Sequence, residues 1–242
     1  MVAPYLREVS QPPGNRDVCV VVPMYDEASS VGDVVRDLRW SFAKVVCVDD
    51  GSSDDCARVA AEAGAVVVRH PVNLGQGAAL QTGFTYALTD PEVGYLVTFD
   101  SDGQHRRVDA EAMVRTARGE GVDVVLGSRF LTPSEVHVPP LRRMVLRAAT
   151  AFTRATTGLD LTDTHNGLRV LSRRAVEVMD LTLDGMAHAS QLLSRIAQHR
   201  LSYVEAPVTI QYTDYSRARG QSNVNALNIA FDLALERLRG AG

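Results

Sequence analysis

Two aspartates one residue apart, Asp100 and Asp102, stand where a buried strand is predicted to end. The stretch YLVTFDSDGQH starts with apolar residues and then places these two carboxylates beside Gln104. Two like charges this close raise each other's pKa unless a cation lies between them. Carboxylate and amide oxygens suit a hard divalent ion, so we predict that Asp100, Asp102 and Gln104 bind Mg²⁺ or Mn²⁺. With so few protein ligands, such an ion completes its shell with substrate phosphates, which predicts a substrate that carries a diphosphate.

Polar and glycine residues also follow the other predicted strands. In an open parallel sheet the carboxyl ends of the strands form one edge, where ligands bind. The segment from Asp50 to Ser53 could by itself be only a turn that caps a helix, and NLGQG only a connection. The chain has neither a dinucleotide fingerprint nor a Walker motif. Five such segments at one edge nevertheless predict a site; they contain Pro23, Tyr25 and Glu27, then Asp49 to Ser53, then Gly75 and Gln76, then Asp100, Ser101 and Asp102, then Gly127 to Arg129.

The spacing of apolar residues predicts the elements that hold these side chains. In the first half, β-branched runs alternate with helical spacing, which predicts an α/β fold with a mostly parallel sheet flanked by helices. After Phe130 we expect a C-terminal helical extension with one further strand. We predict a flexible leader over 1–16 and a single domain over 17–242, with halves 17–130 and 131–242. The predicted strands cover 18–24, 44–50, 65–70, 95–100, 123–129 and 201–212, and the predicted helices 29–40, 53–63, 77–88, 108–118, 140–157, 186–199 and a terminal segment.

The composition narrows the class of protein. The chain of 242 residues is 45% hydrophobic with a formal net charge of -4, which predicts a globular protein without a nucleic-acid partner. Cys19, Cys47 and Cys56 form no paired motif, so we expect buried thiols in a reducing compartment. The N-terminus lacks the apolar core of a secretory signal, and no apolar run is long enough to span a bilayer. Any work at a membrane would be done from its surface.

Six motifs occur in the order seen in one enzyme family. The chain resembles the family-2 inverting glycosyltransferases of GT-A fold, and most closely their dolichyl-phosphate-mannose-synthase-like branch of polyprenyl-phosphate glycosyltransferases. The likeness extends from Val18 to Asn223. The motifs are VVPMYDEASSV, VVCVDDGSSDD, NLGQGAALQTGF, FDSDGQH, GSRF and DTHNGLR.

The resemblance implies a GT-A, Rossmann-like fold in which the 17–130 half binds a nucleotide sugar and the 131–242 half faces the acceptor. It implies that Asp100 and Asp102 are the DXD pair that holds the metal and the donor diphosphate. The residues that it places around the donor are Pro23, Tyr25, Glu27, Val48, Asp50, Gly75, Gln76, Ser101 and Arg217. The chain departs from the family's pattern at Gln76, Leu168 and Asn223, which replace the Lys of GKG, the Phe of GFR and the Lys of GxSK. Two cations near the diphosphate are thereby lost.

The activity that the resemblance implies is the metal-dependent, inverting transfer of a hexose from a GDP-mannose or UDP-glucose type of donor to a polyprenyl phosphate. The catalytic candidates are Asp102, Asp163, Arg129 and Arg169. A cation at Asp100 and Asp102, helped by arginines, would stabilise the leaving diphosphate. The alternative acceptor is a hydroxyl of a saccharide or small molecule, which needs a general base, and Asp163 is the candidate. A phosphate acceptor is already anionic and needs arginines instead.

The segment from Pro140 to Thr157 carries several arginines and no acidic residue, beside an apolar stripe at helical spacing. This pattern fits a helix on an anionic membrane surface, and it also fits an ordinary amphipathic helix packed on the domain. The resemblance favours the membrane, so we expect a cytoplasmic protein, peripheral at the inner face of the cytoplasmic membrane, with a small membrane protein as a candidate partner. Two other classes are a nucleotidyltransferase, which would need a basic glycine-rich loop after the first strand, and a non-catalytic nucleotide-binding protein. Nothing in the sequence distinguishes a guanine from a uracil donor.

Overall fold

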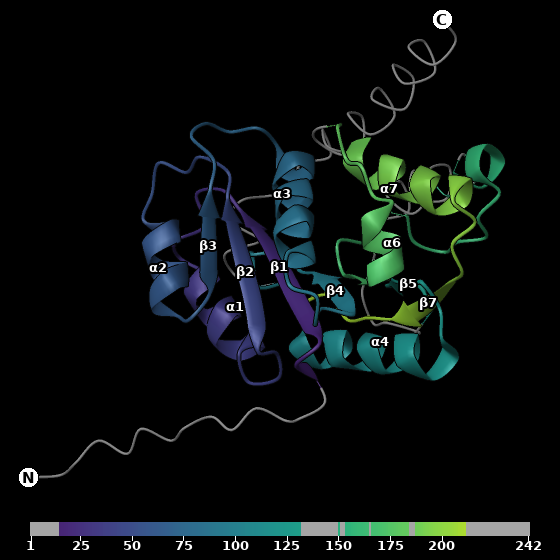
Figure 1. Ribbon diagram of the computed structural model, residues 1–242, viewed down its shortest axis with the longest axis horizontal. Coiled ribbons are helices and arrows are strands. Elements are labelled where there is room, and N and C mark those ends of the chain that lie inside the picture. Colours follow the sequence, from purple (N-terminus) through teal and green to yellow (C-terminus); the bar gives the residue numbers. More distant parts are fainter. Residues whose placement is uncertain (1–14, 132–149, 151–152, 165, 184–186, 212–242) are drawn as a thin grey trace, which may run out of the picture.

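A single seven-stranded sheet organises the chain, in the order β3-β2-β1-β4-β6-β5-β7 (Figure 1). The computed structural model describes residues 15–131, 150, 153–164, 166–183 and 187–211. The strands are β1 (Val18–Met24), β2 (Lys44–Asp49), β3 (Val66–Arg69), β4 (Tyr95–Thr98), β5 (Val124–Ser128), β6 (Arg169–Ser172) and β7 (Tyr203–Pro207).

Neighbouring strands pair in parallel except at β6, which runs antiparallel to both β4 and β5. The predicted α/β fold with a mostly parallel sheet is therefore confirmed. The sequence did not predict β6, because the strand is only four residues long, RVLS, and begins with a charged side chain. Its insertion pairs Arg169 with Thr98, and Thr98 Oγ1 donates a hydrogen bond to the Gly167 carbonyl oxygen at 2.6 Å. Gly167 and Arg169 thus lie beside the end of β4.

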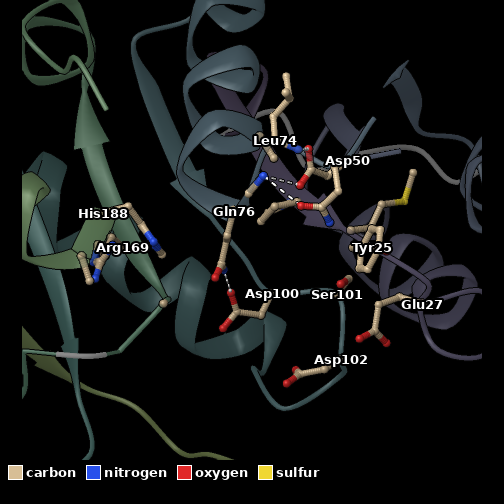
Figure 2. Close-up of a pocket in the computed structure, with 17 residues that line it drawn as sticks. Tyr25, Glu27, Asp50, Leu74, Gln76, Asp100, Ser101, Asp102, Arg169 and His188 are labelled. Atoms are coloured by element: carbon tan, nitrogen blue, oxygen red, sulfur yellow. Dashed lines mark hydrogen bonds between the residues drawn. The ribbon is translucent and has the colours of Figure 1, made fainter. Parts of the chain in front are cut away.

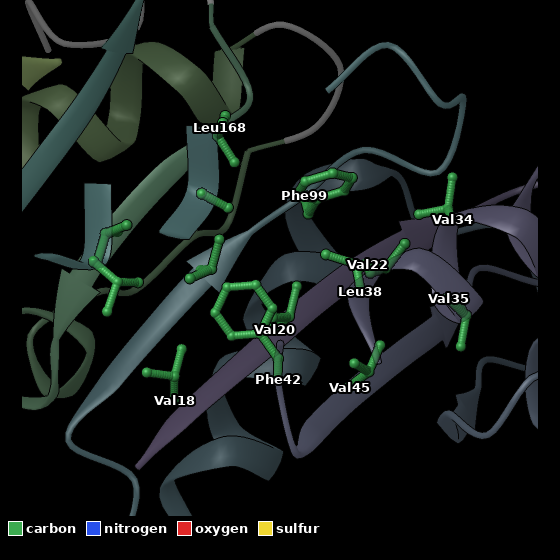
Figure 3. Close-up of a cluster of buried hydrophobic side chains, with 14 of the residues drawn as sticks. Val18, Val20, Val22, Val34, Val35, Leu38, Phe42, Val45, Phe99 and Leu168 are labelled. Carbon is green, nitrogen blue, oxygen red and sulfur yellow. The ribbon is translucent and has the colours of Figure 1, made fainter. Parts of the chain in front are cut away.

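Helices cover both faces of the sheet, as the continuous apolar strands require. Alternate side chains of β1 divide between two buried clusters, with Val20 and Val22 in one and Cys19 and Val21 in the other. The first cluster, drawn in Figure 3, includes residues of α1 (Val31–Leu38), α2 (Cys56–Glu62) and α4 (Arg107–Glu120). The second includes residues of α3 (Gln76–Leu88), α6 (Arg173–Glu177) and α7 (Ala187–Gln198). A strand that is buried on both faces leaves only its ends available for polar chemistry.

The carboxyl ends of β1, β2 and β4 lie at one edge of the sheet. Strand pairing places Met24 beside Asp49, and the backbone N of Asp50 donates to the Met24 carbonyl oxygen at 3.0 Å. On the other side of β1, the backbone N of Phe99 donates to the Val21 carbonyl oxygen at 3.0 Å. The loops after these three strands therefore begin next to one another, which is where a ligand site is expected.

Some expectations fall outside the described residues. These are most of the leader over 1–16, most of the helix over 140–157, in which residues 153–157 are helical, and the terminal helix. Cys19, Cys47 and Cys56 are buried and unpaired, as expected, and burial raises the pKa of the Cys47 thiol to about 12. Within the described ranges every helix is too short or too polar to traverse a bilayer.

Gly83 allows α3 to lie directly on β1. A Cβ at this position would fall 2.2 Å from Cγ1 of Val21. We expect Gly83→Ala to lower the free energy of unfolding by roughly 1–3 kcal/mol, because overpacking outweighs the gain of about 1 kcal/mol in helix propensity. The matched control is Gly119→Ala in α4, where a Cβ meets no atom within 4 Å and stability should rise by up to about 1 kcal/mol. Urea unfolding measures both, and equal stabilisation by the two variants would contradict the close packing at Gly83.

Candidate active site

A pocket of about 730 Å³ opens where β1, β2 and β4 end (Figure 2). This volume is in the range of sites for small molecules and cofactors. The residues that were predicted for the site and that line the pocket are Pro23, Tyr25, Glu27, Asp50, Gly75, Gln76, Asp100, Ser101, Asp102 and Arg169. The structure therefore brings together side chains from segments that are far apart in the sequence.

The lining of this pocket is strongly acidic. Among the described residues, its charged lining consists of four carboxylates and one arginine, namely Glu27, Asp50, Asp100, Asp102 and Arg169. A diphosphate that entered alone would meet a surface of net negative charge. A hard divalent cation prefers carboxylate and phosphate oxygens, and would attract both the protein and the ligand. The donor set of the pocket thus fits the predicted metal.

Neighbouring groups hold Asp100 in its charged form. Its Oδ2 lies 2.8 Å from Nε2 of His105, and its Oδ1 accepts a hydrogen bond from Nε2 of Gln76 at 3.4 Å. Burial alone would raise the pKa of this carboxyl, but the charge and the hydrogen bond of His105, together with the charge of Arg169, lower the pKa below its usual value. His105 itself is buried with its ring edge-on to Phe99, the centroids 5.4 Å apart. His105 therefore sets the orientation and charge of Asp100 without lining the pocket.

Asp102 has less compensation than Asp100. Burial, and then the negative charge of Asp100, raise the pKa of the Asp102 carboxyl above its usual value. A cation bound by both carboxylates would remove this repulsion. Among the described residues no group of three His, Cys, Asp or Glu side chains could hold a metal. Gln104, the third predicted ligand, does not line the pocket, and its backbone N donates to Asp102 Oδ1 at 2.9 Å.

Asp50 organises the loop between β3 and α3. Its carboxylate accepts hydrogen bonds from the backbone N of Leu74 at 2.9 Å and of Gly75 at 2.8 Å, and lies 2.7 Å from Nδ1 of His70. The other ring nitrogen of His70 lies 2.9 Å from Thr82 Oγ1 on α3. The carboxylate thus holds the predicted NLGQG segment in place while still bordering the pocket. The sequence does not reveal the contact between His70 and Asp50, because the two residues are 20 positions apart in the chain.

Two loops brace each other beside Tyr25 and Glu27. Asp26 between them has a φ of 52°, a left-handed conformation that residues other than glycine rarely adopt. Its Oδ1 accepts a hydrogen bond from the backbone N of Ser53 at 2.8 Å, and its own backbone N donates to Ser52 Oγ at 3.0 Å. Bonds in both directions join the loops after β1 and β2, and so determine where Tyr25 and Glu27 enter the pocket.

Three further predicted site residues do not line the pocket. Val48 is fully buried in the core around β2, because its β-branched side chain points into the sheet packing, and it does not line the pocket. Arg129 and Asp163 form a two-pronged ion pair, with Nε–Oδ2 at 2.7 Å and Nη2–Oδ1 at 2.8 Å, and neither residue lines the pocket. The Asp163 side chain is only 1% exposed, and its carboxylate is engaged by Arg129. Arg217 lies outside the described residues.

Arg169 and His188 enter the pocket from the second half of the chain. Arg169 is the first residue of β6, and His188 belongs to α7, a helix that the sequence predicted without assigning this residue. The close approach of α7 depends on Gly77, where a Cβ would fall 2.9 Å from the Cβ of His188. No local pattern marks His188, because its position follows from how α7 packs on α3.

Comparison with known proteins identifies the family. The model of Glycosyl transferase family 2 matches residues 19–179. The chain belongs to this family. The matched segment includes every pocket-lining residue except His188 and Ala189. The predicted resemblance is thus confirmed, and this family-2 chain is an enzyme that transfers sugars.

Its relatives support the polyprenyl-phosphate branch of the family. An uncharacterized protein of Methanocaldococcus jannaschii is 34% identical over 93% of this chain and 94% of its own. The UDP-N-acetylglucosamine--dolichyl-phosphate N-acetylglucosaminyltransferase of Methanococcus voltae is 28% identical over 91% of this chain and 96% of its own. The polyprenol monophosphomannose synthase of Mycolicibacterium smegmatis is 31% identical over 87% of this chain and 82% of its own.

Solved structures confirm the GT-A fold. Glucosyl-3-phosphoglycerate synthase from Mycobacterium tuberculosis, in complex with Mn²⁺, uridine diphosphate and glucosyl-3-phosphoglycerate, superposes with a TM-score of 0.64. The alignment covers 93% of this chain and 80% of that one at 20% identity. At this identity the likeness concerns the fold.

Gly167 leaves the space that the Asp100 carboxylate occupies. A Cβ at position 167 would fall 2.4 Å from Oδ2 and 2.8 Å from Oδ1 of Asp100. We expect Gly167→Ala to push Asp100 away from His105 and to weaken the binding of Mn²⁺ with a nucleoside diphosphate roughly 10- to 100-fold, as changes beside metal ligands do. Isothermal titration calorimetry measures this, with Gly119→Ala as the control. Unchanged affinity in a folded Gly167→Ala variant would show that Asp100 does not bind the metal.

Proposed function

We propose that this family-2 glycosyltransferase transfers a hexose from a nucleotide sugar of the GDP-mannose or UDP-glucose type to a polyprenyl phosphate, by an inverting reaction that depends on Mg²⁺ or Mn²⁺. The acidic lining of the pocket is the observation that carries the proposal. In the part of the lining that the structure describes, four carboxylates and one arginine disfavour a free diphosphate, so donor binding is proposed to require a cation. Two relatives have names that refer to dolichyl phosphate and to polyprenol, and these names support the proposed class of acceptor.

Asp100 and Asp102 are the residues proposed to hold the cation. When bound, the cation supplies a Lewis acid next to the charge that grows on the leaving diphosphate. His105 keeps Asp100 charged and oriented for this task. Gln76 adds a neutral amide where the family's pattern has a lysine, so this chain relies on the cation for positive charge at that point. The Mn²⁺ and uridine diphosphate in the complex of the similar mycobacterial synthase support this assignment.

The nucleoside part of the donor is proposed to lie along Tyr25, Glu27 and Asp50. These residues line the pocket at the ends of β1 and β2, on one side of the Asp100 and Asp102 pair (Figure 2). The hydrogen bonds of Asp26 with Ser52 and Ser53 hold these loops in position before a ligand binds. Such preorganisation lowers the cost of binding, because the loops need not be ordered at that step.

A phosphate acceptor fits this geometry better than a hydroxyl acceptor. A hydroxyl needs a general base, and the Asp163 carboxylate, the candidate for that role, is engaged by Arg129. An ionised phosphate oxygen needs no base. It would form a bond to the anomeric carbon while the bond from that carbon to the diphosphate oxygen breaks, and the electron pair would leave with the nucleoside diphosphate. One displacement of this kind inverts the anomeric configuration.

The acceptor also determines where the enzyme would work. A polyprenyl phosphate is anchored in a bilayer, so we propose a peripheral protein at the cytoplasmic face of the membrane, with a small membrane protein as a candidate partner. The two proposed halves of the domain then have separate roles. Residues 17–130 provide the carboxylates and the nucleoside segment, and residues 131–242 provide Arg169 and His188 on the acceptor side.

Thermal unfolding tests the donor and the metal together. We expect GDP-mannose or UDP-glucose, at about 100 times its dissociation constant, to raise the melting temperature by about 5–10 °C with Mn²⁺ and by much less without it. Asp102→Asn should abolish this shift, whereas Asp33→Asn, on the exposed face of α1, should preserve it. A shift of equal size without the metal would refute the role of the two aspartates.

Sugar transfer to a lipid tests the acceptor. With a labelled donor, we expect transfer to a polyprenyl phosphate and a kcat/KM at least about 100-fold lower for the matching polyprenol, because a site built around a charged group rejects the analogue that lacks it. Mn²⁺ should be required, and Asp102→Asn should lower turnover roughly 100- to 1,000-fold. Faster transfer to the alcohol, or to 3-phosphoglycerate, would favour the alternative of a hydroxyl acceptor.

A further inference from the structure

Arg169 is a buried cation whose guanidinium lacks hydrogen-bond partners among the described residues. It is 3% exposed, and its guanidinium makes no hydrogen bond or ion pair with the described parts of the chain. Burial lowers the pKa of this guanidinium, although the charges of Asp100 and Asp163 act in the opposite direction. Buried charges in proteins are normally paired, because desolvation without compensation is costly. The free protein therefore holds a positive charge that an anionic ligand would stabilise.

The other arginines near this edge do not share this property. Arg129 is bound to Asp163, and Arg69 lies 2.9 Å from Asp49 through its Nε atom. Of the arginines that the structure describes, Arg169 lines the pocket, and its planar group can offer two parallel donors to a phosphate. The pocket thus contains a guanidinium that the fold leaves available.

The position of Arg169 indicates which anion it receives. In Figure 2, Arg169 and His188 lie on one side of Asp100, and Tyr25, Glu27 and Asp50 lie on the other. A nucleotide sugar is extended, with its diphosphate between the nucleoside and the sugar. If the nucleoside lies at the β1 and β2 ends and the diphosphate at the aspartates, the sugar and the acceptor lie towards β6 and α7. A neutral hexose cannot compensate the charge of a buried guanidinium, whereas the phosphate of an acceptor can.

We infer that Arg169 and His188 form a subsite for the phosphate group of the acceptor, on the opposite side of the metal-binding aspartates from the nucleoside. This inference rests on the proposed function and adds to it the residues that recognise the acceptor. Arg169 provides charge and two donors, and His188 provides a ring nitrogen from α7. The subsite joins β6 and α7, so it exists only in the folded chain.

Steady-state kinetics with geranyl phosphate, a short acceptor soluble in water, test the subsite. We expect Arg169→Met to raise the KM for geranyl phosphate about 10- to 100-fold, the usual effect of losing a charged hydrogen bond. The KM for the nucleotide sugar should change by less than about 3-fold. Arg169→Lys keeps the charge without the planar fork and should fall between the wild type and Arg169→Met. His188→Leu should raise the same KM by a smaller factor.

The control variants are Arg115→Met on the exposed face of α4 and His199→Leu just beyond α7, both remote from the pocket lining. Neither should change either KM. A higher KM for the donor with an unchanged KM for geranyl phosphate would assign Arg169 to the diphosphate and overturn the subsite. A lower melting temperature with both KM values unchanged would make Arg169 structural and would also overturn it.

Failure of the proposed function gives a different result. If the wild type does not glycosylate geranyl phosphate at all, the acceptor class is wrong, and the subsite is judged by melting the protein with Mn²⁺, nucleoside diphosphate and inorganic phosphate. Extra stabilisation by phosphate in the wild type that is absent in Arg169→Met would retain the subsite for another phosphate-bearing acceptor. Equal stabilisation of both proteins would overturn it.

Discussion

The repulsion between Asp100 and Asp102 is the constraint on which the rest of the site depends. Keeping both carboxylates charged at the end of a buried strand costs electrostatic free energy. The two aspartates also differ in the groups that contact them. His105 and Gln76 contact Asp100, and the pKa of Asp102 is raised by burial and by its neighbour. A bound cation would relieve the pair. The protein thus keeps an unfavourable arrangement that a metal and its diphosphate ligand would convert into a favourable one.

The packing of the sheet makes this arrangement durable. Both faces of β1 are buried, so its loops can only extend from the edge, and there the loops after β1 and β2 bind each other through Asp26 and Ser53. Close contacts at glycines supply the remaining room, at Gly167 for the Asp100 carboxylate and at Gly77 for the approach of α7. Each of these features positions residues that line the pocket.

The charges of the chain fall into two groups. Arg129 and Asp163 form an ion pair with two hydrogen bonds, which engages the carboxylate that was the candidate base. Arg169 is buried without such a partner. Functional sites commonly contain groups that lower the stability of the free protein. A bound ligand then provides the interaction that such a group lacks. The position of Arg169 in the pocket is therefore more informative about the acceptor than the number of arginines in the chain.

The amino-acid sequence by itself determined the fold class, the order of most strands and helices, the acidic pair and the family, because local apolar spacing and short motifs carry that information. It did not reveal β6, since four residues beginning with a buried arginine show no strand pattern. The pairing of Asp163 with Arg129, the buried position of Val48 and the partnership of His70 with Asp50 were also beyond it. His188 is the clearest case, because its place in the pocket follows from the packing of α7 on α3 around Gly77. Contacts between elements that are far apart in the chain produce no periodic pattern in the sequence. Which side chains these contacts bring together is therefore decided only by the tertiary structure.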